Sequence, residues 1–406
     1  MSEQLTAEQT EAIYFNPWDE AFRANPYPHY KPLLAGPPRI LDLGYKFALV
    51  ARYADVRAVL MDHATFSSVQ PKEMGFDEQA KLLGDAPTVL GSDPPVHTRL
   101  RRLVSRDFTP RRISQLESRI REIATQLTEA VARKGEFDVM RDLANPLPVM
   151  VIAELLGVPA ERYEQFKHWS DKVIESDNTP PGMPMPDDVK QAAAELNEYF
   201  ASEIERRRKD PGPDLVSALV AHHEADAETL SAAELLAFAV LLLLAGNETT
   251  TNLIGNGMLA LGWHPAAMAA LRANPAGLKM AIEEMLRYDG PVQSTFRTTT
   301  RECEVGGTRL DAGVGVFVIV AAANRDPREF PDPERFDITR ASNNHLAFGE
   351  GIHFCIGAPL ARLEAAIAFE TALKRFSNLT LKNPDAPLVY KGSYFLRGLT
   401  SLAMAI

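Results

Sequence analysis

Hydrophobic residues recur at intervals of three and four along most of the first three quarters of the chain, and this pattern predicts a mainly helical fold. The clearest amphipathic stretch covers residues 110–133, where the hydrophobic positions are Ile113, Leu116, Ile120, Ile123, Leu127 and Val131. The same reasoning predicts helices over residues 143–156, 161–174, 189–208 and 275–288. Residues 177–186 carry four prolines, so we expect a loop between helices there.

One long helix is predicted to begin after Ser231. Ser231 is a favourable N-cap, and Glu234 three residues later completes a capping box. The pattern continues to about Gly262, and residues 235–244 are apolar on every side, which predicts burial all round. The longest apolar run, residues 235–246, is shorter than the ~20 residues that cross a membrane, so we expect a core helix.

Strand signals are fewer than helix signals. They predict a hairpin over residues 39–50 around Leu43 and Gly44, short strands over 294–300, 308–310 and 314–320, and a return of the chain near 396–405. No internal repeat or low-complexity linker divides the chain. We therefore expect a mainly α fold with a small β region, as one domain over residues 1–406, with residues 1–25 as a loosely ordered N-terminal segment.

Composition and charge narrow the class of protein. The net charge of −11 disfavours nucleic acid as a partner. The two cysteines, Cys303 and Cys355, rule out a disulfide scaffold and favour a reducing, intracellular compartment. Residues 1–11 are polar and lack the apolar stretch of a signal peptide or a membrane anchor. We expect a soluble, cytoplasmic protein that does not insert into a membrane.

The segment over residues 348–357 carries the strongest chemical signal. Its sequence, FGEGIHFCIG, places Cys355 just before an expected helix, where backbone N–H groups and the helix dipole stabilise a thiolate. Glycines at 349, 351 and 357 allow backbone shapes and a close approach that side chains would block. The alternative is a glycine turn around a buried, inert cysteine. Cys303 has no motif around it and is assigned no role.

This segment resembles the haem-binding loop of the soluble bacterial cytochromes P450, and the resemblance extends from about Pro26 to the C-terminus. It implies the cytochrome P450 fold, with haem b as cofactor and Cys355 as the axial thiolate ligand of the iron. The resemblance also implies contacts from the cofactor loop and from propionate-binding side chains. The residues implied to bind the cofactor are His97, Arg101, Arg297, Phe348, Gly349, Gly351, His353, Cys355 and Gly357.

Two further groups of residues match the family. Glu284, Arg287 and Arg335 are similar to its Glu-Arg-Arg triad, which is implied to be a buried charge network that holds the cysteine segment. Taken alone, Glu284 and Arg287 have the spacing of a solvated ion pair one turn apart, which is the usual outcome for such residues. Glu248 and Thr249 resemble the pair that activates oxygen and relays protons. The alternative for Thr249 is a hydroxyl bonded to the preceding helical turn.

The expected activity is monooxygenation, in which one atom of O2 enters an organic substrate. The chain has no flavin or nicotinamide fingerprint, so the resemblance implies NAD(P)H electrons delivered by a ferredoxin or flavodoxin. Residues 97–112 contain six arginines and one aspartate, which are either a docking patch for that partner, extended by Arg362, or a solvated helix edge. A monomer is expected.

Two other hypotheses are a non-catalytic haem sensor, which the Glu248–Thr249 pair disfavours, and a cysteine-nucleophile hydrolase, which no His-Asp pair supports.

The substrate pocket is placed only by analogy with the family. It is assigned to Leu241, Leu244, Ala245, Val292, Phe296 and Phe395. These positions carry no fixed charge, so we expect a lipophilic substrate that binds mainly through apolar burial. The loop over residues 177–186, with two methionines among its prolines, is expected to act as a movable lid.

Overall fold

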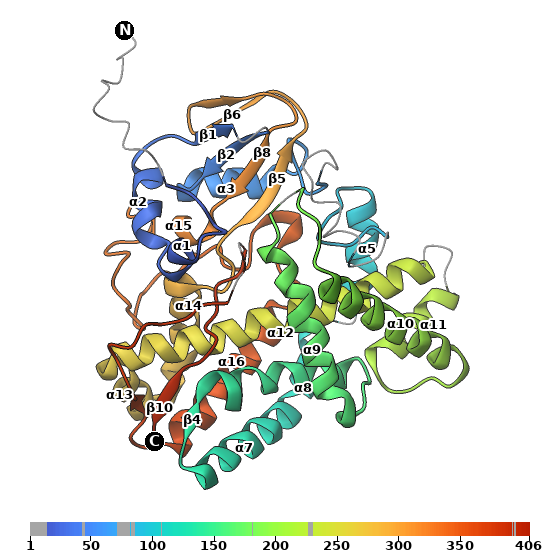
Figure 1. The fold of residues 1–406 in the computed structure, drawn as a ribbon, viewed down its shortest axis with the longest axis vertical. Helices are drawn as coiled ribbons and strands as arrows, with labels where there is room; N and C mark the ends of the chain where they lie inside the picture. Colours follow the sequence, from blue (N-terminus) through green and yellow to red (C-terminus); the bar gives the residue numbers. More distant parts are fainter. Residues whose placement is uncertain are drawn as a thin grey trace.

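Helices make up most of the protein, as the hydrophobic pattern predicts (Figure 1). The computed structural model describes residues 14–42, 45–70, 82, 86–106, 108–180, 182–225, 230–391, 393 and 395–406. The α-helices are α1 (Glu20–Ala24), α2 (Tyr27–Ala35), α3 (Tyr53–Met61), α5 (Val96–Ser105), α6 (Pro110–Gln115), α7 (Glu117–Lys134), α8 (Pro146–Leu155), α9 (Tyr163–Ile174), α10 (Asp187–Lys209), α11 (Leu215–Ala225), α12 (Ala232–Trp263), α13 (Pro265–Ala273), α14 (Leu278–Asp289), α15 (Val320–Ala323) and α16 (Ala358–Arg375).

The main sheet forms a smaller region at one end of the molecule, and a second small sheet lies at the opposite end (Figure 1). The strands are β1 (Arg39–Asp42), β2 (Lys46–Val50), β3 (Phe66–Ser67), β4 (Phe137–Asp138), β5 (Thr295–Thr299), β6 (Cys303–Val305), β7 (Thr308–Leu310), β8 (Gly315–Val318), β9 (Thr380–Leu381) and β10 (Ala403–Ala405). The main sheet has the order β1-β2-β8-β5-β3, in which β2 and β8 run parallel and the other neighbours antiparallel. The C-terminal return is confirmed, because β10 pairs with β4 and β9.

Helix α12 crosses the middle of the molecule (Figure 1). Its predicted capping box is confirmed: the Ser231 hydroxyl accepts from the Glu234 N–H, and the Glu234 carboxylate accepts from the Ser231 N–H. By length and composition alone α12 could cross a membrane, but two thirds of its most apolar window is buried inside the protein. Most of its hydrophobic surface is therefore buried in the core of the protein.

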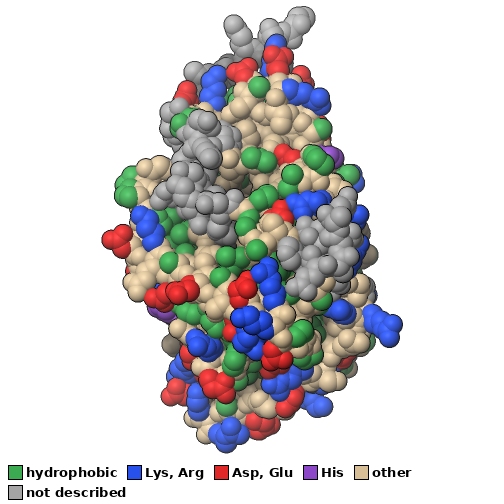
Figure 2. Space-filling model, turned by 90° about the vertical axis from the view of Figure 1, so that its right-hand side faces the viewer, with side chains coloured by type: hydrophobic (Ala, Val, Ile, Leu, Met, Phe, Trp, Pro, Cys, Tyr) green, Lys and Arg blue, Asp and Glu red, His purple; other side chains and the backbone are tan. Residues whose placement is uncertain are grey.

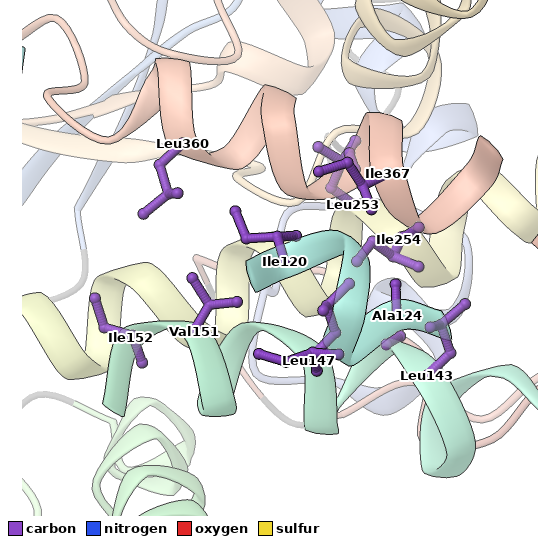
Figure 3. Close-up of a cluster of buried hydrophobic side chains, with 14 of the residues drawn as sticks. Ile120, Ala124, Leu143, Leu147, Val151, Ile152, Leu253, Ile254, Leu360 and Ile367 are labelled. Carbon is purple, nitrogen blue, oxygen red and sulfur yellow. The ribbon is translucent and has the colours of Figure 1, made fainter. Parts of the chain in front are cut away.

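The main core lies where α12 meets α7, α8 and α16. Figure 3 shows side chains from these helices interdigitating, among them Ile120, Leu147, Ile254 and Ile367, all of which are fully buried. The second half of α12 and the middle of α16 thus pack in one core. Because α16 directly follows the cysteine segment, this core fixes where Cys355 lies.

Three sequence expectations are corrected by the structure. The stretch 110–133 is two helices, because α6 ends at a tight turn in which the Leu116 N–H donates to the Ile113 carbonyl. The three-and-four spacing of hydrophobic residues continues across this turn, so the pattern alone does not reveal the break. The stretch 143–156 begins as a π turn (Met140–Ala144), and a regular helix starts only at Pro146, which suits a first turn. Residues 20–24 of the N-terminal segment are ordered as α1 with Phe22 buried; residues 1–13 lie outside the described part.

Candidate functional site

The cysteine segment is a glycine-shaped loop that leads into α16. Gly349 and Gly351 have φ values of +70° and +72°, a conformation that side-chain-bearing residues rarely adopt. A Cβ on Gly351 would also lie 2.8 Å from the Leu60 carbonyl oxygen. The Cys355 N–H donates to the Phe348 carbonyl at 2.9 Å, which closes the loop. Backbone conformation therefore favours glycine at both positions, and close packing is a second reason at Gly351.

The Cys355 thiol lies in a site with opposing influences on its charge. Burial raises its pKa, while the backbone N–H groups of Gly357 and Ala358 and the guanidinium groups of Arg101 and Arg362 lower it. Burial has the larger effect, so the pKa stays above that of a free thiol. The helix terminus alone therefore does not produce the thiolate. A cation bound directly to the sulfur would supply the missing stabilisation.

A charge network between α14, α16 and His345 supports the cysteine loop, and the sequence alone did not predict it. Arg362 on α16 donates to both oxygens of Glu283 on α14, at 2.7 and 2.8 Å, and its guanidinium lies over the Phe348 ring. His345 contacts the same carboxylate at 3.0 Å. Burial raises the pKa of Glu283, but the bonds from Arg362 and His345 outweigh it and bring that pKa to about 2. Arg362 is half-buried and its guanidinium is already paired with Glu283, which weakens its assignment to a docking patch.

Four basic side chains gather beside the cysteine loop from three separate parts of the chain. His97 and Arg101 come from α5, Arg297 from β5 and His353 from the loop itself. The rings of His97 and His353 lie 4.3 Å apart, and Arg101 donates to the Phe354 carbonyl at 2.7 Å. The sequence reasoning named all four, and the structure brings them together. It also adds Asp93, whose carboxylate accepts from the Ser67 hydroxyl and the Ser68 N–H and lies near Arg297 and His353.

The electrostatics of this basic cluster point to an anionic ligand. Burial, then Arg297 and His97, lower the pKa of His353 to about 4, and burial lowers that of Arg297 to about 10. The buried Nε2 atom of His97 has no hydrogen-bond partner among the described residues. A buried polar atom without a partner is costly, and so is the burial of basic groups whose pKa values are lowered, unless an acid binds there. The residues present therefore fit a group that carries acids and lies against the glycine loop.

Helix α12 presents the acid–alcohol pair in the middle of its length. Ala245 is exposed, and Leu244, Gly246 and Thr249 are half-buried, although the helix is buried on either side of them. This part of α12 therefore faces a hollow. The Thr249 hydroxyl donates to the Ala245 carbonyl at 2.6 Å, which leaves its oxygen lone pairs to accept from a ligand. This is the local bond of the alternative interpretation, and it is compatible with the functional one.

Glu248 points to a partner that the sequence reasoning did not find. Its carboxylate accepts from the Lys391 ammonium at 2.9 and 3.0 Å. Lys391 belongs to the segment after α16, 143 residues further along the chain. No local pattern connects the two residues, so only the fold shows the pair.

The predicted triad is corrected at its third member. Glu284 and Arg287, both fully buried, form a doubly bonded pair at 2.8 Å. The side chain of Arg335 instead pairs with Asp337 and is 65% exposed; only its backbone carbonyl accepts from Arg287. Arg340 contacts Glu284, at 3.2 Å, and takes the position assigned to Arg335. The loop turns between the two arginines, so that Arg340 points inward.

The predicted pocket residues fall into two groups. Leu244 packs beside Val173 and Met185, so it lies near the loop expected to form a lid. Val292 pairs with Leu396, and the Gln293 N–H donates to the Phe395 carbonyl at 2.7 Å, which joins two of the predicted pocket segments.

Phe296 is assigned wrongly to the pocket. It is buried against Phe47 and Phe317 in the core of the main sheet. Neighbouring side chains alternate along a strand, so Arg297 and Phe296 cannot face the same side.

A separate cavity of about 620 Å³ lies elsewhere in the protein. It is bounded by α6, α7 and α8 and by residues 211–221, and none of the predicted pocket residues lines it. Leu360, five residues after Cys355, is its nearest link to the cysteine loop. We therefore distinguish this cavity from the predicted substrate pocket.

The arginine-rich stretch is only partly available for a partner. Arg99 is bonded to Glu234, and Arg101 points to the Phe354 carbonyl. The other four arginines are exposed: Arg102, Arg106, Arg111 and Arg112. Figure 2 shows the side of the molecule that carries α5, α10 and α11, where basic and acidic side chains are interspersed over the lower half. Docking by charge would depend on the exposed arginines alone.

The fold and the cysteine loop together define a haem-thiolate protein class, and comparison with known proteins gives the family. The family model "Cytochrome P450" matches residues 38–275 and 277–401. The chain is 44% identical over 387 residues to the cytochrome P450 monooxygenase PikC of Streptomyces venezuelae, covering 94% of this chain and 91% of that protein. It is 41% identical to the vitamin D(3) 25-hydroxylase of Pseudonocardia autotrophica, covering 95% and 94% of the two chains.

A solved structure agrees with these relatives. The myxobacterial cytochrome P450 CYP267B1, described in complex with myristic acid, superimposes with a TM-score of 0.88 at 38% identity, covering 95% of this chain and 98% of that one. The chain belongs to the cytochrome P450 family. It is a haem-thiolate monooxygenase of the bacterial type, an enzyme class that requires O2, electrons from a redox partner and, in general, a lipophilic substrate.

Proposed function

We propose that Cys355 is the axial ligand of haem b and that His97, Arg101, Arg297 and His353 bind the haem propionates. The observation that carries this assignment is the basic cluster beside the cysteine loop, with His97 Nε2 left without a partner among the described residues. Two propionate groups would give the two guanidinium groups their counter-charges and would accept hydrogen bonds from the two imidazole rings. Phe348, Gly349, Gly351 and Gly357 shape the loop against which the ring would lie.

The remaining site residues either deliver protons or hold the cysteine segment in place. Bound haem supplies the iron that activates O2. Thr249, in the hollow beside α12, holds a hydroxyl that accepts a hydrogen bond while it donates to Ala245. Glu248 supplies the proton, and Glu284, Arg287 and Arg340 hold the segment that precedes Cys355. Conversion of Glu248 to glutamine should slow turnover, because an amide cannot deliver a carboxylic proton.

The ligand assignment is tested by converting Cys355 to alanine. We expect Cys355→Ala to lose the thiolate-specific spectrum of the reduced carbon monoxide complex. Cys303→Ala is the matched control, since it removes the other thiol, on β6, and should leave that spectrum unchanged. If Cys355→Ala keeps the spectrum and Cys303→Ala loses it, the assignment is overturned.

The substrate we propose is a lipophilic molecule without strong charge where it contacts the pocket, such as a fatty acid chain, terpenoid, steroid or macrolide-like compound. Leu241, Leu244, Ala245 and Val292 support this class because they are apolar, and relatives are named for vitamin D(3) and for a myristic acid complex. The test is a titration of a compound panel followed by the haem spectrum. Tight binding of small, highly charged compounds, with no response to fatty acids, steroids or terpenes, would exclude this class.

Electrons are proposed to come from NAD(P)H through a ferredoxin or flavodoxin, which docks on the exposed arginines Arg106, Arg111 and Arg112. We propose that the enzyme acts as a cytoplasmic monomer and as one P450 domain. The charge-reversal variant Arg111→Glu should lower the rate of haem reduction and weaken its dependence on salt. A rate that stays unchanged at low salt would exclude this face as the docking site.

A further inference from the structure

The cavity bounded by α6, α7, α8 and residues 211–221 has the size and the lining of a ligand site. Its volume of about 620 Å³ lies within the ~300–1,000 Å³ that is usual for small-molecule sites. Buried apolar side chains form its floor, and Figure 3 shows three of them, Ile120, Val151 and Leu360, directed toward one another from α7, α8 and α16. Gln115 and Pro213 line the cavity and are exposed, so it opens to solvent.

The wall made by the loop between α10 and α11 is fixed by hydrogen bonds within the protein. The Asp214 carboxylate accepts from the Arg207 guanidinium at 3.2 Å, from the Ser217 N–H at 2.9 Å and from the Ser217 hydroxyl at 3.1 Å. The Gly212 N–H donates to the Ser217 hydroxyl at 2.8 Å, and Arg207 also donates to the Gly157 carbonyl at 2.7 Å. This wall is therefore preformed, and its carboxylate already has a counter-charge.

The opposite wall joins α7 to α8 and leaves one hydrogen-bond acceptor available. The Glu154 Oε1 atom accepts from Arg119 and, at 3.2 Å, from the Tyr163 hydroxyl. The Glu154 Oε2 atom accepts from the Arg119 Nε at 2.8 Å and from no second donor among the described residues. A carboxylate oxygen accepts two hydrogen bonds, and this side chain is 28% exposed. A hydroxyl group inside the cavity would therefore find an acceptor in Glu154.

The charges around the cavity favour an uncharged occupant. Asp214 is paired with Arg207, and Arg119 is paired with Glu154, so neither wall offers a charge that lacks a partner. Arg112 also lines the cavity, but it is exposed, and water and salt screen its charge. A charged ligand would lose its hydration without a matching gain, whereas an apolar ligand gains from burial.

We propose that this cavity is a second ligand site, which binds an uncharged lipophilic molecule with a hydroxyl group, such as a steroid alcohol. The apolar body of the ligand lies on Ile120, Val151 and Leu360, and its hydroxyl donates to Glu154 Oε2. Leu360 belongs to the first turn of α16, five residues after Cys355, so the site lies on the side of the cysteine loop. It is separate from the predicted substrate pocket and does not depend on the proposed reaction.

The test measures steroid binding while the haem pocket is closed. The haem-loaded enzyme is saturated with phenylimidazole, whose nitrogen binds haem iron, and the haem spectrum confirms saturation. Equilibrium dialysis with radiolabelled testosterone, which is uncharged and has one hydroxyl, should then show one bound molecule per chain. Progesterone has the same ring system but no hydroxyl, so it should bind about tenfold more weakly, as expected for the loss of one hydrogen bond to a charged acceptor.

Three tryptophan variants locate the bound steroid. Leu155→Trp on α8 and Ala218→Trp on α11 each place a large ring in the cavity from a half-buried lining position. Leu127→Trp is the matched control, because Leu127 is a half-buried leucine of α7 that does not line the cavity. We expect the first two variants to lower testosterone affinity at least about tenfold and the control to leave it unchanged. The carbon monoxide spectrum and circular dichroism check that each variant is folded.

Three results would overturn this assignment. The first is that the wild type binds no testosterone once phenylimidazole fills the haem pocket. The second is that folded Leu155→Trp and Ala218→Trp bind testosterone as tightly as the wild type, which would place the steroid elsewhere. The third is equal affinity of the wild type for progesterone and testosterone, which would exclude the hydrogen bond to Glu154; this comparison does not depend on the folding of any variant.

Discussion

The buried charge network around Glu284 offers a direct test of how the cysteine segment is held. Glu284 receives hydrogen bonds from Arg287, from the Asp337 N–H, from Asn343 and from Arg340. Arg287 uses its remaining donors on the Asn324, Pro333 and Arg335 carbonyls. The sequence assigned the outer arginine to position 335, whereas the structure places Arg340 there, so the two arginines form a matched pair of substitutions.

The expected magnitudes differ because the burial of the partners differs. Glu284→Ala leaves the fully buried Arg287 without its counter-charge, which costs about 3–5 kcal/mol. Arg340→Met removes the hydrogen bond to the charged Glu284 carboxylate from a largely buried site, about 1.5–3 kcal/mol, together with bonds to the Pro331, Asp332 and Arg335 carbonyls. Arg335→Met removes an exposed ion pair with Asp337, about 0–1 kcal/mol. The free energy of unfolding of a typical protein is about 5–15 kcal/mol. Glu284→Ala therefore removes much of the stability, whereas Arg335→Met is close to neutral.

The assay is urea unfolding of each haem-loaded variant at equal haem content, followed by helix circular dichroism and by the carbon monoxide spectrum. We expect the midpoint to fall most for Glu284→Ala, less for Arg340→Met and least for Arg335→Met, with haem retention in the same order. Equal losses for the two arginine variants, or a larger loss for Arg335→Met, would refute the placement of Arg340 in the network.

Three further predictions follow from the site. Thr249→Ala should still bind haem and substrate but form less product per NAD(P)H and more hydrogen peroxide, and unchanged coupling would exclude the proposed role of the hydroxyl. Gly351→Ala should lose haem content and stability, because strain of about 1–2 kcal/mol at φ +72° adds to a contact with the Leu60 carbonyl, whereas Gly313→Ala, with φ +79° and open space around it, should show the strain alone. Glu283→Gln tests the pH dependence: the folded-state pKa of about 2 lies below the unfolded value, so the carboxylate stabilises the fold above about pH 4.5 and this contribution is lost as the pH falls toward 2. The melting-temperature gap between wild type and Glu283→Gln should be constant from pH 8 to 5 and shrink below 4.5; a gap that widens on acidification would contradict the sign.

Features coded by local pattern were predictable from the sequence. The long helix begins at Ser231 because its capping box needs only residues three apart, and it is buried because its apolar residues surround the axis. The cysteine loop was equally readable, since its glycines and its cysteine occupy ten consecutive positions and the helix follows directly. Four basic residues from separate segments could be named only through the family resemblance, and the structure then brings them together.

Contacts between distant segments were not predictable. Lys391 meets Glu248 across 143 residues, and Glu283 meets Arg362 across 79, with no spacing rule to join either pair. The choice between Arg335 and Arg340 depends on how an irregular loop turns, which periodicity does not describe. Such contacts depend on tertiary packing, where a shift of a few residues changes the partner but not the local pattern.

The error at Phe296 is different, because the sequence contained the information to avoid it. Residues 295–299 form a strand, and neighbouring side chains on a strand face opposite sides of the sheet. Once Arg297 is assigned to the propionates, Phe296 must face away from them, into the core with Phe47 and Phe317. Thr295 shares the side of Arg297, and the Arg297 guanidinium donates to its hydroxyl at 3.2 Å. Thr295 is therefore the strand residue that belongs beside the haem site, and a pocket assignment on any short strand should be checked against this alternation before it is made.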